Sequence, residues 1–273
     1  MALGPESGRD LLRHVQVEVI RRAALEPPIV EEIIGGCVTQ GRGAEPELLH
    51  ECLDETARLG AGVIGEDTLA RLLPASVAVA VSDAPGADPP LEPIESAGLV
   101  GAVGRRRREF AIGRYCARRA LGRLGEPVHA IPVGDHRQPL WPPGIIGSIT
   151  HCQGFCAAAV ARTTLLRGLG IDAEPVAILD DEVSSLIATP LEQVRALAEP
   201  PAVGMTLLFS AKESVFKCMF PLTGVFLEFL DVTISLQADG TFVAGSRLLD
   251  LTPLVGRYAV VAGHVLTTAV IPG

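Results

Sequence analysis

The sequence predicts an α/β fold of the α+β type with mostly antiparallel sheets. A strand, a long helix and further strands follow one another twice, around residues 76–161 and 169–270, with no residue-level repeat between the two series. Turn sequences between neighbouring strands favour antiparallel pairing. Apolar residues make up 48% of the 273 residues and charged residues 20%. This composition excludes a fully disordered chain and allows a sizeable core.

In the first series, a long helix is the best-defined element. It is expected from about Gly104 to Leu124, because Gly125 and Pro127 are typical of a helix end. A strand is expected before it, and a Pro/Asp loop joins the two. A rigid Pro-rich turn and two more strands are expected after it. These segments are the strand 76–82, the loop 83–93, the turn 139–144 and the strands 145–150 and 155–161.

In the second series, a strand at 169–173 is followed by short helical pieces at 182–198. A second long helix is expected at 205–220, after the prolines at 200 and 201. Two hairpins complete the chain: strands 232–236 and 241–243 flank Asp239-Gly240, and a last hairpin covers 257–270.

The first 69 residues are expected to form a helical N-terminal extension whose role the sequence does not indicate. Helical patterning covers residues 10–25 and 45–59. The N-terminus lacks the basic start and apolar run of a secretory signal. No stretch of the chain approaches the ~18 uninterrupted apolar residues of a membrane span. We therefore expect a cytoplasmic protein that binds no membrane.

Charge is concentrated in one place. The net charge of −9 argues against nucleic-acid binding, yet residues 105–123 hold eight arginines and one acid, Glu109. Such a patch on an acidic protein suits a small polyanion such as a phosphorylated cofactor. The alternative is a solvated arginine-rich helix face. The six cysteines form no CxxC or zinc-like spacing, so we expect reduced, mostly buried thiols.

Two acids two residues apart form the sharpest local signal. Asp172 and Glu174 lie at i and i+2 on an expected strand, so both carboxylates project from one face. Converging carboxylates suit a hard cation such as Mg²⁺ or Mn²⁺. The alternative is an acid pair that faces solvent at a strand end.

Two further segments add candidate groups. Glu213 and Lys217 are four residues apart on one helix face, and Lys212 and Lys217 are the only lysines of the chain. A lysine can neutralise a phosphate oxygen and a glutamate can bind metal or accept a proton. The alternative is a surface ion pair. The segment 147–151 (GSITH) offers a glycine, two hydroxyls and His151 as donors to phosphate.

Together these segments resemble the 4′-phosphopantetheinyl transferases, in particular the larger monomeric type that activates siderophore, peptide and polyketide synthetases. The resemblance covers about residues 70–270. The matching stretches, in order, are 106–114 (RRREFAIGR), 141–151 (WPPGIIGSITH), 170–174 (GIDAE), 209–217 (FSAKESVFK) and 221–224 (PLTG).

The resemblance implies a role for each matched residue. Asp172, Glu174 and Glu213 would bind Mg²⁺, or Mn²⁺ in its place, and Glu213 would also be the base, directly or through water. Lys217 would neutralise charge on the transferred phosphate. Contacts to coenzyme A are implied for the remaining matched residues, Arg106, Arg114, Ser148 and His151. One departure is the loop 133–138, where related sequences can carry a further basic contact and this chain offers Arg137.

The resemblance also implies the reaction and the architecture. Phosphopantetheine would pass from coenzyme A to a serine hydroxyl of an acyl or peptidyl carrier domain, releasing 3′,5′-ADP. We expect a monomeric pseudo-dimer with halves at 70–167 and 168–273. Met219, Phe220, Leu222 and Phe226 would dock the carrier or, alternatively, belong to the core. The rival functions are a metal-dependent phosphohydrolase of coenzyme A-like nucleotides and a decayed module that only binds coenzyme A or a carrier.

Overall fold

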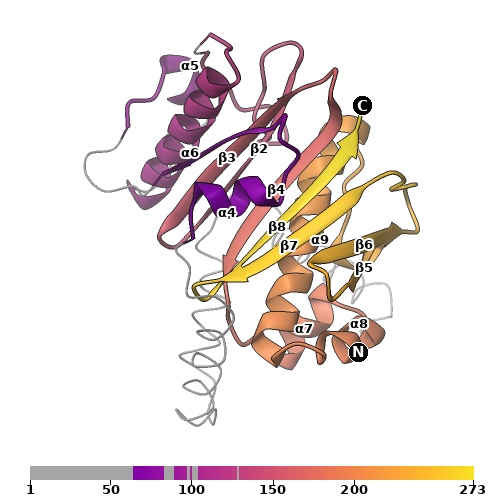
Figure 1. Cartoon of the computed structure of the whole chain (residues 1–273). Helices are drawn as coiled ribbons and strands as arrows, with labels where there is room; N and C mark the ends of the chain where they lie inside the picture. The colour runs from indigo at the N-terminus through magenta and orange to yellow at the C-terminus, as the bar shows by residue number, and fades with distance from the viewer. Residues whose placement is uncertain (1–63, 83–88, 97–98, 100–103, 128) are drawn as a thin grey trace, which may run out of the picture.

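The computed structural model describes residues 64–82, 89–96, 99, 104–127 and 129–273. Two antiparallel sheets, each with one long helix against it, make up the fold (Figure 1). This arrangement confirms the expected mixed fold. The helices expected at 10–25 and 45–59 lie outside the described residues.

The first half is a three-stranded sheet with strand order β1-β3-β2, covered by α6. Helix α6 ends as expected, because Gly125 adopts a left-handed conformation with φ 81°. The apolar face of α6 packs against β1, β2 and β3 around Leu121 and Val160. The elements of this half are α4 (Glu66–Arg71), β1 (Ala78–Ser82), α5 (Pro93–Ser96), α6 (Gly104–Arg123), β2 (Ile145–Cys152) and β3 (Phe155–Arg162).

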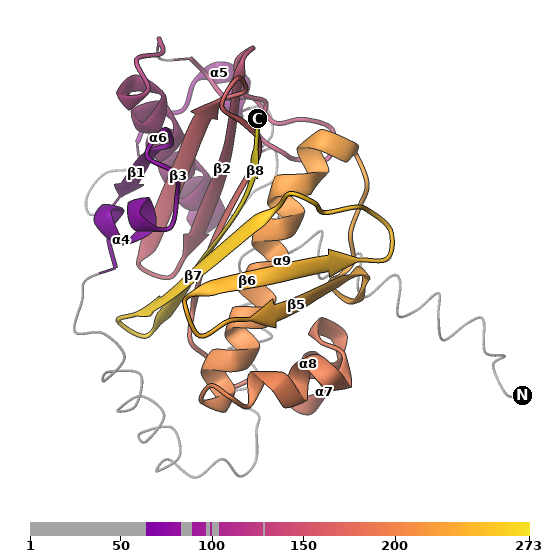
Figure 2. The same ribbon diagram turned by 45° about the vertical axis from the view of Figure 1, so that its right-hand side comes forward.

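The second half is a five-stranded sheet with strand order β4-β8-β7-β6-β5, and α9 runs across one of its faces (Figure 2). Helix α9 begins at Pro201 rather than 205, because proline suits the first turn of a helix. Its elements are β4 (Leu166–Pro175), α7 (Asp181–Ile187), α8 (Pro190–Ala196), α9 (Pro201–Thr223), the 3₁₀ turn η2 (Phe229–Asp231), β5 (Val232–Leu236), β6 (Thr241–Ser246), β7 (Val255–Val261) and β8 (His264–Pro272).

Two short helices were not expected from the sequence. Helix α4 spans the boundary that we expected between residues 69 and 70, and its Leu69 is fully buried in a core shared by β3, β4 and β8. Helix α4 therefore packs against strands of both halves. Helix α5 lies partly within the expected loop, and its buried Glu95 accepts two hydrogen bonds from Arg118, at 2.9 and 2.7 Å.

Helix α9 lies directly on β4 because two glycines leave no side chain between them. A Cβ atom at Gly170 would lie 1.9 Å from the carbonyl oxygen of Ser214, and one at Gly168 would lie 2.7 Å from the Cys218 sulfur. Both distances are shorter than any tolerated contact. The glycines of the segment RGLGID thus set the height of α9 above the strand.

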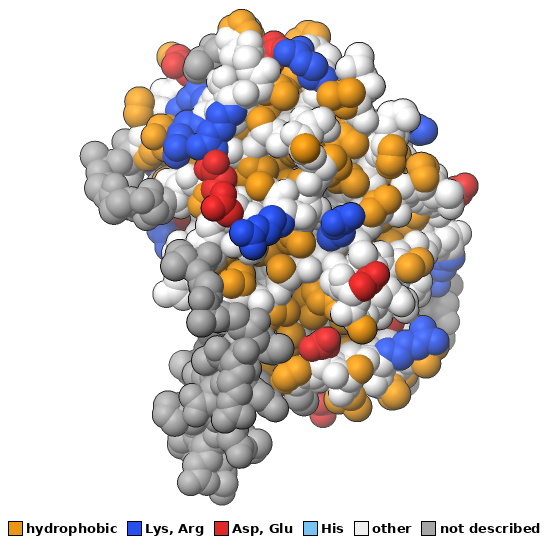
Figure 3. Space-filling view, in the orientation of Figure 1, with side chains coloured by type: hydrophobic (Ala, Val, Ile, Leu, Met, Phe, Trp, Pro, Cys, Tyr) orange, Lys and Arg blue, Asp and Glu red, His pale blue; other side chains and the backbone are white. Residues whose placement is uncertain are grey.

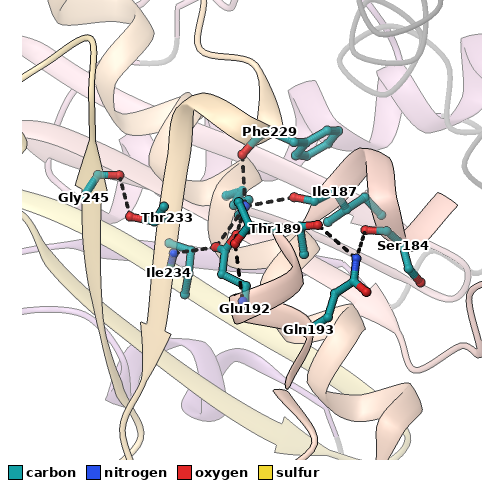
Figure 4. A network of polar contacts seen from close by, with 11 residues as sticks. Ser184, Ile187, Thr189, Glu192, Gln193, Phe229, Thr233, Ile234 and Gly245 are labelled. Atoms are coloured by element: carbon teal, nitrogen blue, oxygen red, sulfur yellow. Dashed lines mark hydrogen bonds and ion pairs between the residues drawn. The ribbon is translucent and has the colours of Figure 1, made fainter. Parts of the chain in front are cut away.

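A buried ion pair anchors the middle of α9. The Lys212 ammonium donates to Glu192 on α8 at 3.0 Å, and to the carbonyl oxygens of Ile187 at 2.8 Å and Phe229 at 3.0 Å. Glu192 also accepts from the backbone N–H of Ile234 at 2.8 Å (Figure 4). Burial lowers the pKa of Lys212, although Glu192 opposes the shift. Lys212 therefore holds α7, α8, η2 and β5 together.

No helix in the part of the chain that the structure describes combines the length and apolar character needed to cross a bilayer. Of the six cysteines, the four in the described ranges are free thiols, and Cys37 and Cys52 lie outside those ranges.

Lys212→Met should lower the free energy of unfolding by about 3–5 kcal/mol, because it leaves the Glu192 carboxylate buried without its counter-charge. The double variant Lys212→Met/Glu192→Gln should recover part of this loss. Urea denaturation measures both. The control is Arg247→Met, which breaks the more exposed ion pair with Asp231 and should cost under about 1 kcal/mol. Equal losses in the two single variants would contradict this account.

Gly170→Ala should destabilise the protein by about 3 kcal/mol, because its methyl group meets the backbone of α9 rather than a side chain that can turn away. Gly122→Ala on α6 is the control: nothing lies within 4 Å of its added methyl group. That substitution should be neutral or stabilise by up to ~1 kcal/mol. Thermal denaturation compares the two variants, and a stable Gly170→Ala protein would refute the close approach.

Candidate active site

Asp172 is the centre of the site and is almost fully buried on β4. Its Oδ1 accepts from the Lys217 ammonium at 2.6 Å and from the Thr150 hydroxyl at 3.2 Å. Its Oδ2 accepts from the Ser210 hydroxyl at 2.8 Å. One carboxylate thus receives donors from β2 of the first half and α9 of the second.

Glu213 lies beside this carboxylate, one turn before Lys217 on α9. Its side chain is only 4% exposed. Burial raises the pKa of Glu213 to about 7; the Asp172 carboxylate adds to the shift, and Lys217 opposes it. A carboxyl group with this pKa exchanges its proton near neutral pH, as a general base requires.

For the pKa of Lys217, the nearby charges outweigh the effect of burial. Burial disfavours its charged form, but the carboxylates of Asp172 and Glu213 outweigh that effect and raise its pKa. Glu174, half-buried near the end of β4, acts in the same direction. The structure therefore brings the predicted residues Asp172, Glu213 and Lys217 together, with Glu174 within electrostatic reach.

The carboxylates of Asp172 and Glu213 do not by themselves form a complete binding site for a divalent cation. No three His, Cys, Asp or Glu side chains among the described residues form a metal-binding group. Mg²⁺, however, is usually held by one or two carboxylates together with substrate phosphates. Asp172 and Glu213 supply such a pair, since the Asp172 carboxylate is close enough to Glu213 to add to the rise in pKa that burial causes. The donor chemistry therefore fits Mg²⁺.

The segment GSITH joins the two halves through side-chain hydroxyls. The Ser148 hydroxyl accepts from the backbone N–H of Ile171 at 3.0 Å, and the Thr150 hydroxyl accepts from that of Ala173 at 3.1 Å. We call these two contacts the seam. Ser148 is buried there, and its expected contact with coenzyme A stays a prediction. No described residue accepts its hydroxyl hydrogen.

His151 alternates with these hydroxyls and pairs with Cys156 on β3. Burial lowers the pKa of His151 and Lys217 acts in the same direction, whereas the carboxylates of Glu109 and Asp172 oppose it. Glu109 is a site-proximal acid whose role the sequence did not indicate. Its Oε1 accepts from Arg105 at 2.9 Å, and its buried Oε2 has no hydrogen-bond partner among the described residues.

Seven of the eight arginines of α6 divide into two groups. Arg118 pairs with Glu95, while Arg119 and Arg123 donate to the carbonyl oxygens of Val81 and Val79. These three arginines stabilise the first half. The first turn of α6 carries four more, including the half-buried Arg106, and basic side chains gather over this helix in Figure 3.

Arg114 differs from its neighbours because it is buried, yet only one of its three guanidinium nitrogens donates a hydrogen bond to a described residue. Its Nε donates to the carbonyl oxygen of Ile131 at 2.8 Å, and its guanidinium lies 4.2 Å from the ring centroid of Phe110. Burial lowers its pKa to about 10, so it stays charged at neutral pH. No hydrogen bond from its two terminal nitrogens to a described residue is present, which leaves a fixed cation able to bind an anion. Arg137 is exposed, with a positive φ of 62°.

The apolar run after Lys217 is partly core. Met219 and Phe220 are buried, whereas Leu222 and Phe226 are 42% and 37% exposed. Only these last two are available to a partner protein.

Glu213→Gln should stabilise the chelator-treated protein at pH 8 by about 3 kcal/mol and have little effect below pH ~4.5. The folded state holds the Glu213 proton more tightly than the unfolded state, because folding raises this pKa from 4.5 to about 7. Stability from this group is therefore full at low pH and is lost as pH rises through 7, whereas glutamine does not titrate. Urea denaturation from pH 4.5 to 8 measures the difference. A difference that does not change with pH would refute the raised pKa.

Comparisons with known proteins show which family the chain resembles. The family model for the 4′-phosphopantetheinyl transferase N-terminal domain matches residues 95–161, and that for the 4′-phosphopantetheinyl transferase superfamily matches 168–268. The chain is 46% identical to 4′-phosphopantetheinyl transferase Svp of Streptomyces mobaraensis over 198 residues, covering 69% of this chain and 79% of that protein. It is 40% identical to 4′-phosphopantetheinyl transferase PptT of Mycobacterium tuberculosis over 223 residues, covering 74% and 97%.

A third relative shares less of its length. Enterobactin synthase component D of Salmonella typhi is 38% identical over 122 residues, which cover 42% of this chain and 50% of that protein. The two family models are separated between β3 and β4, with β2 and most of β3 in the first match and most of β4 through much of β8 in the second. The chain therefore belongs to the 4′-phosphopantetheinyl transferase superfamily, in its larger form, and is an enzyme that transfers the 4′-phosphopantetheine group.

Proposed function

We propose that the chain transfers phosphopantetheine from coenzyme A to a serine hydroxyl of an acyl or peptidyl carrier domain, in a Mg²⁺-dependent reaction that releases 3′,5′-ADP. The observation that carries this proposal is the contact of Asp172 with Lys217 beside the buried Glu213. A metal-binding acid, a base and a cation then lie within one small site, which is what phosphoryl transfer to a hydroxyl requires.

Coenzyme A would bind along the first half, where the fixed donors lie. Arg114 offers a buried cation whose terminal nitrogens donate to none of the described residues, and Arg106 lies two turns earlier on α6. Ser148 and His151 lie three residues apart on β2 and would contact the phosphates nearer the site. Charge-assisted hydrogen bonds of this kind are about twice as strong as neutral ones.

Asp172 and Glu213 would hold Mg²⁺, or Mn²⁺ in its place, with Glu174 as a third oxygen ligand. When bound, the cation would neutralise the pyrophosphate of coenzyme A. The chain's own residues would do the rest. Their positions support one role for Glu213 and another for Lys217.

Glu213 would accept the proton of the serine hydroxyl, directly or through water, as the hydroxyl oxygen bonds to the β-phosphorus. The bond from that phosphorus to the bridging oxygen breaks, and 3′,5′-ADP leaves with the electron pair. Lys217 would stabilise the charge that develops on the transferred phosphate. Its 23% exposed side chain can reach a bound phosphate.

The acceptor would be a carrier protein that docks near the end of α9, where Leu222 and Phe226 are exposed. Because one relative is a component of enterobactin synthase, we propose carriers of siderophore, peptide or polyketide synthetases as acceptors. We further propose that the enzyme acts as a cytoplasmic monomer and that residues 64–273 carry the activity.

The test is incubation of the full chain with Mg²⁺, coenzyme A and a panel of apo-carriers, followed by mass spectrometry. A carrier that gains the mass of phosphopantetheine supports the proposal. Consumption of coenzyme A without that gain would instead identify a phosphohydrolase. Binding of coenzyme A or a carrier without turnover would identify a binding module.

Lys217→Ala should lower turnover about 100-fold and weaken coenzyme A binding less, because the charge that Lys217 stabilises grows toward the transition state. Lys217→Arg should restore part of the turnover, since the guanidinium keeps the charge but not its position. Steady-state kinetics and cofactor titration check both variants. Arg257→Ala, which removes an exposed cation on β7, is the control. Normal turnover of Lys217→Ala would reduce this residue to an ion-pair partner of Asp172.

A further inference from the structure

Four hydroxyl side chains lie along α9, and one of them behaves differently. Thr206, Ser214 and Thr223 each donate to a carbonyl oxygen of their own helix, at 2.7, 2.8 and 3.0 Å. This is the usual habit of serine and threonine inside helices. Ser210 instead donates out of the helix to Asp172 Oδ2, at 2.8 Å.

The different behaviour of Ser210 is explained by Thr267, which lies behind it on β8. The Thr267 hydroxyl lies 2.9 Å from the Ser210 hydroxyl and 2.8 Å from the Ser210 carbonyl oxygen, to which it donates. Each hydroxyl carries one hydrogen. Because the Ser210 hydrogen points to Asp172, Thr267 is the only possible donor in its contacts with Ser210, and it donates to the Ser210 carbonyl oxygen. Thr267 thus supplies a donor from behind and leaves Ser210 free to face the carboxylate.

The other oxygen of Asp172 is held from the opposite side. Thr150 on β2 accepts from the backbone N–H of Ala173 and donates to Oδ1. The hydroxyl hydrogen of Thr150 therefore points toward Asp172. Rotation of a carboxylate about its last bond is only weakly restricted by itself. Donors on both oxygens, from two different elements, fix that rotation. All of these side chains are at least 97% buried.

We propose that Thr150, Ser210 and Thr267 form a hydroxyl clamp that positions Asp172 for the divalent cation, with Thr267 acting through Ser210. The clamp rests on the proposed function, because it gives three residues outside the expected ligand set a role at the metal. Partners that orient a metal ligand typically change metal affinity by 10–100-fold when they are removed.

The experiment measures Mn²⁺ binding to the full chain by electron paramagnetic resonance, without coenzyme A or carrier. Ser210→Ala should weaken Mn²⁺ binding about tenfold. Ser214→Ala is the matched control, because it removes an equally buried hydroxyl from the same helix that bonds only to Ala211. It should bind Mn²⁺ like the unmodified chain.

Two isosteric substitutions separate the hydroxyl from the shape of the side chain. Thr150→Val and Thr267→Val keep the volume and lose the donor, so both should weaken Mn²⁺ binding, whereas Thr150→Ser should bind like the unmodified chain. Because Thr267 acts through Ser210, the double variant Ser210→Ala/Thr267→Val should bind no more weakly than Ser210→Ala alone. Circular dichroism checks that each variant is folded, and the valine variants carry the test if Ser210→Ala is not.

A second readout separates this proposal from the proposed function. In the transfer assay, the clamp variants should need more Mg²⁺ for half-maximal turnover, while the KM for coenzyme A at saturating Mg²⁺ stays unchanged. If the unmodified chain transfers phosphopantetheine but Ser210→Ala binds Mn²⁺ as Ser214→Ala does, the clamp is wrong and the proposed function stands. Additive losses in the double variant would overturn the role of Thr267. If the unmodified chain transfers nothing, the proposed function fails, and the clamp with it.

Discussion

The backbones of α9 and β4 approach each other at Gly170 without room for a single carbon atom between them. The positions of the candidate site residues depend on this contact. Asp172 lies two residues along β4 from Gly170, and Glu213 and Lys217 flank Ser214, whose carbonyl oxygen Gly170 faces. With a bulkier residue at 170, α9 would stand farther from the strand, and the 2.6 Å contact between Lys217 and Asp172 would open. The geometry of the candidate site and the packing of the two backbones therefore depend on the same contact.

A second constraint acts across the halves. The two sheets remain separate, and β2 meets β4 through the hydroxyls of Ser148 and Thr150 instead of a backbone ladder. Side-chain contacts can satisfy the N–H groups of an edge strand and still leave the strands free to differ in twist. Because Thr150 also bonds to Asp172, the strand that carries His151 is tied to the acid of the other half. The site therefore forms only where both halves meet.

Sequence reasoning found the elements whose ends are marked by glycine or proline, such as the end of α6 at Gly125, and the acids whose spacing defines one face. It could not find Ser210, because nothing in the segment FSAKESVFK shows that this serine bonds away from its own helix. It also treated the arginines of α6 as one patch, whereas Arg118 and Arg123 serve Glu95 and β1. Local spacing predicts which face a side chain occupies. Its partner depends on residues far away in the chain.

The scarcity of lysine has a practical consequence. Only two of the 23 basic side chains are lysines, and both lie on α9. The Lys212 side chain is 1% exposed and fully engaged, while that of Lys217 is 23% exposed. An amine-directed acylating reagent therefore has a single accessible lysine in the folded protein, and that lysine lies in the candidate active site. The raised pKa of Lys217 keeps its amine protonated at neutral pH, so acylation would need alkaline conditions. Protection of this one amine by a bound phosphate would then report directly on occupancy of the site.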